Sequence, residues 1–435
     1  MRDPTICTSP ERVVRTGNAQ GEGDSAIPSL SRRSLLKVGA AGGVMIATPA
    51  QAAGKMANPA KAFLKPANLN WLNNSGMHLM PRDASEAAQS YLHFKANGHF
   101  PPNYHVFETL SQPRILFADL INARHDEIAL VQSTLAGENL IVNGMGLRRA
   151  KGNIVTDALH YDGSLYLYES LKGKDLELRV VAPRDYGVNL ADLDRAIDRE
   201  TKLVAISHVS SVNGFAHDLK AVCDIAHAKG VPVYADIVQS AGIVPIDVKA
   251  CGIDFAACGS YKWLMGDMGA GFLYVRKEHL GTLVQRIQYG YLQCPTLEQY
   301  AFSDPHSRQW PIEYTVGSEA KDYFEVGTPS VVALITLDKS LRLIQRVGVE
   351  NIANHTQLLI ERLREDLQRM GYRSLTPDGN KSGTTLFSVP NAQQMKAKFD
   401  AASIKAGVRE TEIRFSPGLL STMDDIEHVL DIMQK

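Results

Sequence analysis

The sequence predicts an α/β protein in which a mostly parallel sheet is followed by a smaller α+β domain. Between about residues 126 and 275, short apolar runs rich in β-branched residues alternate with amphipathic helical patterns, which is typical of a parallel sheet covered by helices on both faces. The runs are continuously apolar rather than alternating, as expected for strands buried on both sides. After Pro329 the pattern changes to long amphipathic helices with two short strands.

Seven strands are expected in the first of these regions. In chain order they lie in EIALVQS, GNIVT, LELRVVA, KLVAISHVS, VPVYADI, IDFAACG and GAGFLYV. The second region begins with an amphipathic stretch from Leu334 to Met370, and its expected later elements are TTLFSVP (strand), AQQMKAKFDAASIK (helix), EIRFS (strand) and MDDIEHVLDIMQK (helix). We therefore expect a segment over 53–90 that packs near the cleft, a large domain over 91–329 and a small domain over 330–435.

The first 52 residues have the pattern of an export signal. A basic stretch SRRSLLK at 31–37 precedes an apolar run at 35–47 and the sequence AQA at 50–52, which suits signal cleavage near residue 52. The basic stretch matches a twin-arginine signal, and the apolar run is too short for a membrane anchor. We expect a periplasmic protein, exported folded by the twin-arginine machinery and free of a membrane anchor after cleavage; a disordered basic tail is the alternative.

Composition argues against two classes of partner and one class of site. The 46 basic and 47 acidic side chains leave a net charge of −1, which offers no attraction for nucleic acid or an anionic membrane surface. The five cysteines contain no C-x-x-C pair, so we expect no zinc or other metal site.

Polar residues directly follow several of the expected strands. Because ligands bind outside the carboxyl ends of strands in open α/β sheets, these residues are expected at one edge of the sheet. Asp236 and Lys262 stand out among them. A lysine amine can form a Schiff base with the aldehyde of pyridoxal phosphate, while a carboxylate keeps the pyridine nitrogen protonated, and burial lowers a lysine pKa toward the nucleophilic form. A structural Asp–Lys ion pair is the alternative reading of these two residues.

The surrounding residues carry a resemblance to a known family. The stretch VYADIVQSAGIVPIDVKACGIDFAACGSYKWLMGDMGAGFLYVR resembles the core of class V pyridoxal-phosphate enzymes, in which Asp-x-x-Gln follows one strand and His-Lys or Tyr-Lys follows the next. That family includes aminotransferases, cysteine desulfurases, kynureninase and isopenicillin N epimerase. The resemblance extends from about Asn70 to the C-terminus. It implies the fold type I of pyridoxal-phosphate transferases, with a mixed, mostly parallel seven-stranded sheet, and pyridoxal 5'-phosphate as cofactor.

The resemblance also assigns cofactor contacts by position. Lys262 is the Schiff-base lysine, Asp236 pairs with the pyridine nitrogen, and Gln239 bonds the phenolic oxygen of the ring. His160 is expected to stack on the ring as a catalytic residue, with its neighbour Tyr161 as the alternative. The remaining expected contacts are to the phosphate, from Ser133, Thr134 and Tyr261, and to the phenolic oxygen, from Ser211, which stands where the family has Asn.

Two further motifs imply a dimer and a carboxylate site. YFEVGTPS resembles an element whose Gly327 and Thr328 reach the phosphate in the neighbouring subunit, which implies a homodimer. EIRFSPGLL resembles a C-terminal element whose arginine, here Arg414, grips the substrate α-carboxylate. Asn74 and His78 border the cleft by family position and are expected to bind substrate.

The resemblance leaves the reaction open. Cysteine desulfurases need a mobile cysteine just before the C-terminal arginine, and no cysteine lies between Gly371 and Arg414, so persulfide chemistry on that residue is not expected. SYKWL is closer to kynureninase and the epimerase-like branch, and the exported YFEVGTP pattern resembles periplasmic enzymes that tailor pyoverdine-type siderophores.

We expect an enzyme that forms a Schiff base with an amino acid or amine and a carbanion at Cα, with Lys262 as base. Transamination is the first choice because it is frequent in the family. Epimerisation and β-elimination stay open, as does a catalytically silent binding protein built on the same fold.

Overall fold

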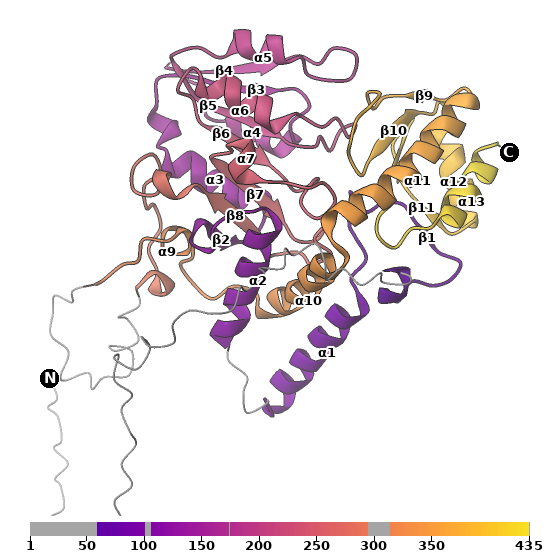
Figure 1. Cartoon of the computed structure of the whole chain (residues 1–435), viewed down its shortest axis with the longest axis horizontal. Coiled ribbons are helices and arrows are strands. Elements are labelled where there is room, and N and C mark those ends of the chain that lie inside the picture. Colours follow the sequence, from indigo (N-terminus) through magenta and orange to yellow (C-terminus); the bar gives the residue numbers. More distant parts are fainter. Residues whose placement is uncertain (1–58, 101–105, 174, 295–313, 435) are drawn as a thin grey trace, which may run out of the picture. The chain divides into compact units, whose positions relative to one another are not determined.

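A computed structural model describes residues 59–434, apart from 101–105, 174 and 295–313 (Figure 1). The predicted leader at 1–52 lies outside the described residues. Three sheets are present in the described part of the chain, with seven, four and two strands. None of the helices among the described residues has the length and apolar character needed to cross a membrane.

The large sheet contains one strand for each of the seven apolar runs, so the predicted α/β class is confirmed. Its order is β2-β8-β7-β6-β5-β3-β4. Strand β8 runs opposite to the other six strands of this sheet, so its pairings with β2 and β7 are antiparallel and the remaining pairings are parallel. The strands are β2 (Ile128–Val131), β3 (Gly152–Asp157), β4 (Leu176–Val181), β5 (Thr201–Ser207), β6 (Val233–Asp236), β7 (Phe255–Gly259) and β8 (Gly271–Val275).

Alternate residues of these strands enter two different cores. Tyr234 and Phe255 point into one core and Val233 and Ala256 into the other, because successive side chains of a strand face opposite sides of a sheet. Helices therefore cover both faces, which is why the strands are apolar throughout. The helices along this region are α3 (Thr134–Gly144), α4 (Asp162–Glu169), α5 (Leu190–Ala196), α6 (Leu219–His227), α7 (Val248–Cys251) and α9 (Ala320–Phe324).

Three longer helices complete this part of the molecule. Helix α10 (Val331–Val347) packs against α1 (Arg82–Asn97) and α2 (Val106–Leu120). Its buried Leu337 and Ile344 belong to a core of the large sheet, although the sequence assigned residues from 330 onward to the small domain. The predicted amphipathic stretch divides at Gly348, whose φ of +83° suits glycine and separates α10 from α11 (Val349–Arg369).

The C-terminal sheet is antiparallel, in the order β12-β13-β10-β9. In Figure 1, α11, α12 and α13 gather beside these strands, and the helices share one apolar core with them. The elements are β9 (Arg373–Ser374), β10 (Thr385–Ser388), α12 (Ala392–Ala401), β12 (Gly407–Val408), β13 (Glu412–Phe415) and α13 (Met423–Gln434).

A two-stranded parallel sheet joins the beginning of the described chain to this C-terminal part. Strand β1 (Asn70–Trp71) pairs with β11 (Ile404–Lys405). This pairing holds the residues that follow β1 beside the end of β13, where they come close to the large sheet. Short 3-10 helices occupy Pro59–Ala62, His125–Glu127, Leu147–Arg149, Lys277–His279 and Tyr291–Gln293.

Candidate active site

A cavity of about 110 Å³ lies at the carboxyl edge of the large sheet. The last residues of β5 and β6, Ser207 and Asp236, line it together with Lys262 from the loop after β7. This is the edge at which ligands bind in open α/β sheets. The rest of the lining is Ser133, Thr134, Leu135, Tyr161, Ser211, Val238, Gln239 and Tyr261.

Burial shifts the two central ionisable groups in opposite senses. It raises the pKa of Asp236 to about 6, although a hydrogen bond of 2.9 Å from the Val238 N–H and the charges of His160 and Lys262 oppose the shift. Burial lowers the pKa of Lys262, which Asp236 partly restores. Because a buried site disfavours charge, the lysine is moved toward its neutral, nucleophilic form.

The side chain of Gln239 is anchored on both ends. Its Nε2 donates to the Ser75 carbonyl at 3.0 Å, and its Oε1 accepts from Trp263 Nε1 at 3.0 Å. One amide hydrogen of Gln239 is left for the cavity, since an amide nitrogen carries two. The same contact ties the segment after β1 to the loop that carries Lys262.

The N-terminus of helix α3 opens onto the cavity. Ser133 caps the helix by accepting from the Ala136 N–H at 3.1 Å, and Thr134 Oγ1 accepts from the Gly259 N–H at 2.9 Å. The second bond fixes the helix start to the end of β7. Free N–H groups and the helix dipole at such a position suit a phosphate, as predicted for these residues. Tyr261 lines the same cavity, and Lys262 Nζ lies 5.6 Å from the centre of its ring.

The structure places Tyr161, and not His160, on the cavity wall. His160 is fully buried, and its ring contacts Ser207 Oγ at 2.8 Å and Glu138 Oε1 at 3.3 Å. Tyr161 is the residue before helix α4 and is 40% exposed. The two residues follow a turn in which the His160 backbone N–H donates to the Asp157 carbonyl at 3.2 Å, and only Tyr161 of the pair lines the cavity. Of the two residues expected to stack on the ring, Tyr161 is therefore the one at the cavity, and the stacking role itself stays a prediction.

Arg414 of β13 is a partly buried cation without a carboxylate partner in the described part of the chain. Its Nη1 donates to the Ser211 carbonyl at 2.8 Å, and its buried Nε has no hydrogen-bond partner among the described residues. Burial, with a smaller contribution from Arg409, lowers its pKa to about 10. The positive charge of Arg414 also lowers the pKa of Lys262. A guanidinium without a carboxylate partner at this place suits a ligand carboxylate.

Asn74 and His78 lie behind the Lys262 loop rather than on the cavity wall. The His78 N–H donates to the Tyr261 carbonyl at 3.0 Å, and Asn74 Nδ2 donates to the Ser416 carbonyl at 2.9 Å. Asn74 Oδ1 is buried without a partner in the described region. Burial lowers the pKa of His78 to about 4, so its ring is neutral. These residues support the site but do not line its cavity, and their predicted contact with the substrate stays a prediction.

Gly327 and Thr328 do not reach the 110 Å³ cavity of their own chain. They line a separate cavity of about 560 Å³ that also contacts Ala136 and Asn139 of α3. Thr328 Oγ1 is hydrogen-bonded to the Tyr291 hydroxyl. This placement agrees with the expectation that the two residues serve a neighbouring subunit, which stays a prediction.

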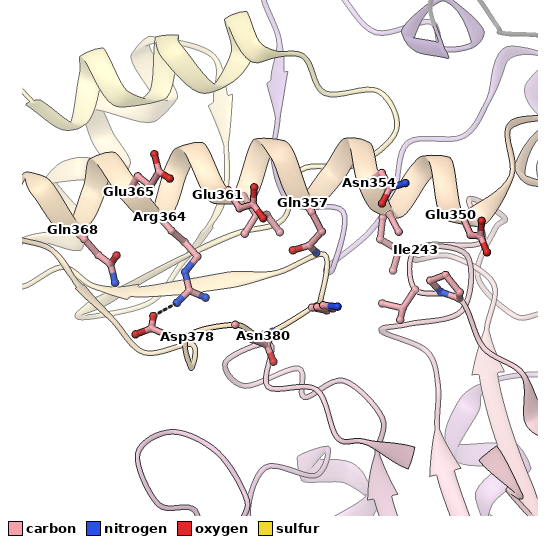
Figure 2. A pocket seen from close by; sticks show the side chains of 16 residues that line it. Ile243, Glu350, Asn354, Gln357, Glu361, Arg364, Glu365, Gln368, Asp378 and Asn380 are labelled. Carbon is pink, nitrogen blue, oxygen red and sulfur yellow. Dashed lines mark hydrogen bonds and ion pairs between the residues drawn. The ribbon is translucent and has the colours of Figure 1, made fainter. Parts of the chain in front are cut away.

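A larger cleft of about 760 Å³ lies elsewhere, between helix α11, the residues around Ile243 and the loop at 378–381 (Figure 2). Arg364 crosses it to form an ion pair of 2.5 Å with Asp378. None of the predicted site residues lines this cleft. Chemical groups and not cavity size therefore locate the active site.

Two residues of the site had no role assigned by the sequence. Ser207 ends β5 and lines the cavity, and Glu138 is a fully buried residue of α3. The available signal for Glu138 is a carboxylate within TLAGENLIV, an otherwise nearly apolar helical run. Such a residue is seldom buried without partners.

Comparison with curated proteins gives relatives of two descriptions. A probable cysteine desulfurase of Pyrococcus abyssi is 29% identical over 333 residues, which cover 74% of this chain and 78% of the relative. An uncharacterised aminotransferase of Bacillus subtilis is 25% identical over 316 residues, covering 72% of this chain and 80% of the relative.

Solved structures share the fold. The apo structure of a cysteine desulfurase from Thermococcus onnurineus matches with a TM-score of 0.72 and 25% identity, covering 84% of this chain and 93% of that one. A cystine C–S lyase in complex with cysteine persulfide matches with a TM-score of 0.74 and 22% identity, covering 85% and 98%. The second likeness supports the fold type I prediction alone, because its identity is low.

The family assignment and the site agree. Residues 70–418 match the aminotransferase class-V family, whose enzymes use pyridoxal phosphate. The residues present fit this cofactor: a buried lysine for its aldehyde, a buried carboxylate on the neighbouring strand end, and a helix N-terminus for its phosphate. The chain therefore belongs to the class-V aminotransferase family and is a pyridoxal-phosphate-dependent enzyme.

Proposed function

We propose that the enzyme removes the Cα proton of an amino acid, or of a larger compound bearing an amine, and that it catalyses amino transfer. The observation that carries this proposal is the convergence of Lys262 and Asp236 on one cavity, with the unpaired Arg414 beside it. A base, an anionic partner for the ring and a carboxylate anchor are the three groups that such chemistry requires of the protein.

The roles of the residues follow from their positions. Pyridoxal phosphate, when bound, supplies an electron sink for the charge left at Cα. Lys262 Nζ takes the Cα proton, and its lowered pKa keeps a neutral amine available. Asp236 holds a proton on the ring nitrogen, and Arg414 orients the substrate carboxylate. The start of α3 at Ser133 and Thr134 holds the phosphate.

Persulfide formation on a protein cysteine is not proposed, although several relatives are named cysteine desulfurases. No cysteine of the described residues lines the cavity, and none occurs between Gly371 and Arg414. Cys258 lies near the site but is fully buried, and burial raises its pKa well above the usual value. A thiolate nucleophile is therefore missing from the part of the site that the structure describes.

A β-elimination that breaks a C–S bond is the second candidate. It is favoured by the relative named a probable cysteine desulfurase, which matches over 74% of this chain. Without a thiol at the cavity, such a bond would break by loss of the leaving group from the carbanion and not by thiol attack. This route uses the same Lys262 and Asp236 as amino transfer.

One experiment separates the reactions. The holoenzyme is incubated with a panel of amino acids, amines and pyoverdine-type siderophore precursors in deuterated water. A keto acid together with the pyridoxamine form of the cofactor supports amino transfer, whereas pyruvate with ammonia or sulfide supports elimination. Racemised, Cα-deuterated substrate would instead mean epimerisation. Turnover by Lys262→Ala at the wild-type rate would overturn the proposed mechanism, and binding of amines without any turnover by the wild type would indicate a silent binding protein.

We further propose that the enzyme works in the periplasm as a homodimer. The support is the twin-arginine pattern at 31–37 and the location of Gly327 and Thr328 away from the cavity of their own chain. Replacing Arg32 and Arg33 by Lys should retain the protein in the cytoplasmic fraction, while Arg12→Lys should not. Unchanged export of the double variant would contradict the twin-arginine route.

A further inference from the structure

A buried chain of polar side chains runs from helix α3 to the cofactor cavity. Glu138, His160 and Ser207 are 0%, 0% and 4% exposed. His160 lies between the other two, with Nε2 3.3 Å from Glu138 Oε1 and Nδ1 2.8 Å from Ser207 Oγ. Of the three, only Ser207 lines the cavity. The mechanism above assigns none of them a role.

The hydroxyl partners of Glu138 act on it as hydrogen-bond donors. Besides the His160 contact, its carboxylate accepts hydrogen bonds from Ser164 Oγ at 2.5 Å and Tyr168 OH at 2.7 Å. Both oxygens of Glu138 thus accept from hydroxyl groups, Oε2 from Ser164 and Oε1 from Tyr168, and a further donor is the partner that suits the remaining contact with His160 Nε2. His160 Nε2 therefore carries a hydrogen.

We assign a hydrogen to the second ring nitrogen of His160 as well, as part of the arrangement proposed below. Burial by itself lowers the pKa of His160, but the hydrogen bond and charge of Glu138, with smaller effects of Asp236 and Asp157, raise it above the usual value. Glu138 and His160 are both fully buried, and among the described residues His160 is the ionisable base in contact with Glu138, so it is the group that can supply a compensating positive charge. Both nitrogens of an imidazolium are donors.

The charge on His160 decides what Ser207 presents to the cavity. When Nδ1 donates to Ser207 Oγ, the hydroxyl hydrogen of Ser207 must point elsewhere and is free to donate into the cavity. If Nδ1 lost its proton, it would accept that hydrogen, and Ser207 would present only lone pairs. The same hydroxyl is thus a donor or an acceptor to the cavity depending on the proton at His160 Nδ1, with which it forms a direct hydrogen bond.

We propose that Glu138 and His160 are positioning residues that hold Ser207 as a hydrogen-bond donor to the ligand in the cofactor cavity. No proton is transferred in this arrangement; the network only orients one. The inference rests on the cofactor site of the proposed function but not on which reaction follows, so it can fail while that function stands.

Other charged and titratable groups face this network and belong in any account of its pH dependence. Asp157 ends β3, accepts from Leu159 N–H at 2.8 Å and contacts His217 at 3.1 Å. Tyr168 stacks beside His160 with ring centres 6.2 Å apart. Among the described residues, the titratable groups around His160 and Asp236 include Glu138, Asp157, Tyr168, His217, Tyr234, Cys258, Tyr261 and Lys262.

The test is a pH titration of the visible absorption band of the cofactor bound to the full-length holoenzyme, which needs no turnover. Ser207→Ala and Glu138→Gln should each raise the pH midpoint of this absorption change by at least about half a unit, because each removes the hydrogen-bond donor from the cavity. Half a pH unit corresponds to a change of roughly threefold in the proton-binding constant. The double variant should shift no further than the larger single shift, since the two residues act through one hydroxyl.

Tyr168→Phe is the matched control. It removes a hydrogen bond of 2.7 Å from the same Glu138 oxygen but leaves the path from Glu138 to Ser207 intact, so its midpoint should equal that of the wild type. Additive shifts in the double variant, or no shift in Ser207→Ala, would overturn the proposal. If Glu138→Gln fails to fold, His160→Gln replaces it, and the same upward shift of the midpoint is expected. A wild-type midpoint in that variant would also overturn the proposal.

Discussion

At the residue scale, burial prepares the two central groups of the site. It raises the pKa of Asp236 to about 6 and lowers that of Lys262, because both charged forms lose hydration. Each group therefore depends on a partner to restore its charge. A bound ring cation supplies that partner for Asp236.

The cofactor-free enzyme should show the cost of this arrangement. Since the pKa of Asp236 is about 6 in the folded state and 3.8 ordinarily, the native state binds the proton more tightly. Stability is unaffected by this group below pH 4 and falls as the pH rises toward 6, by up to about 3 kcal/mol. Asp236→Asn should therefore unfold at a higher temperature than the wild type above pH 6 and at the same temperature near pH 4. Thermal unfolding of both proteins between pH 4 and pH 7 tests this prediction. A difference in melting temperature that does not change with pH would contradict it.

Arg414 should contribute to the recognition of carboxylates and not to the chemistry. Arg414→Lys keeps a positive charge but loses the planar fork, so kcat/KM for an amino acid should fall roughly 10- to 100-fold. Turnover of an amine without a carboxylate should not change. Arg409→Lys is the control, because Arg409 is half exposed and pairs with Glu412. Equal losses for both substrate types would show that Arg414 is only structural.

At the scale of elements, the site is made by strand ends and one helix start. The Thr134–Gly259 hydrogen bond of 2.9 Å joins the start of α3, where we expect the phosphate to bind, to the end of β7, which leads into the lysine loop. A cap at this helix start therefore serves stability and binding at once.

Ser133→Ala tests this double role. Loss of the cap should lower the free energy of unfolding by about 1 kcal/mol, and looser N–H groups should raise the cofactor Kd roughly tenfold. Asn189→Ala removes the equivalent cap of α5, where Asn189 accepts from Ala191 N–H at 2.8 Å, far from the cavity. It should cost similar stability and leave the Kd unchanged. Fluorescence titration with pyridoxal phosphate measures the Kd of each variant, and denaturant unfolding measures its stability. An unaltered Kd in Ser133→Ala would exclude the predicted contact.

Long, buried elements were predictable and short, paired ones were not. The seven strands of the large sheet were evident because helices on both faces demand apolar residues throughout. The two-residue strands β1 and β11 carry no periodic pattern, since only their mutual pairing defines them. The division of the amphipathic stretch at Gly348 was visible as a glycine, but the packing of α10 on α1 and α2 required contacts distant in sequence.

At the scale of the whole molecule, the proposed dimer can be tested by mixing subunits. Lys262→Ala should inactivate the cavity of its own chain, and Thr328→Asp should repel the phosphate in the partner's cavity. When the two inactive variants are refolded together in equal amounts, half of the dimers are mixed and one of their two sites is intact. Activity should return to about a quarter of the wild-type value. No recovery, with mixed dimers demonstrated by mass, would contradict a shared site.

The sequence by itself determined the large sheet, because burial on both faces requires continuous apolar runs. It also determined the cofactor class and its chemical groups, because the Asp-x-x-Gln and Tyr-Lys motifs are short stretches of consecutive residues. The tertiary structure decided which side chains meet. It put Tyr161 rather than His160 on the cavity wall, placed Asn74 and His78 behind the lysine loop, and joined Glu138 to His160 across 22 residues. These outcomes depend on the direction of side chains and on contacts between distant segments, which no local pattern encodes.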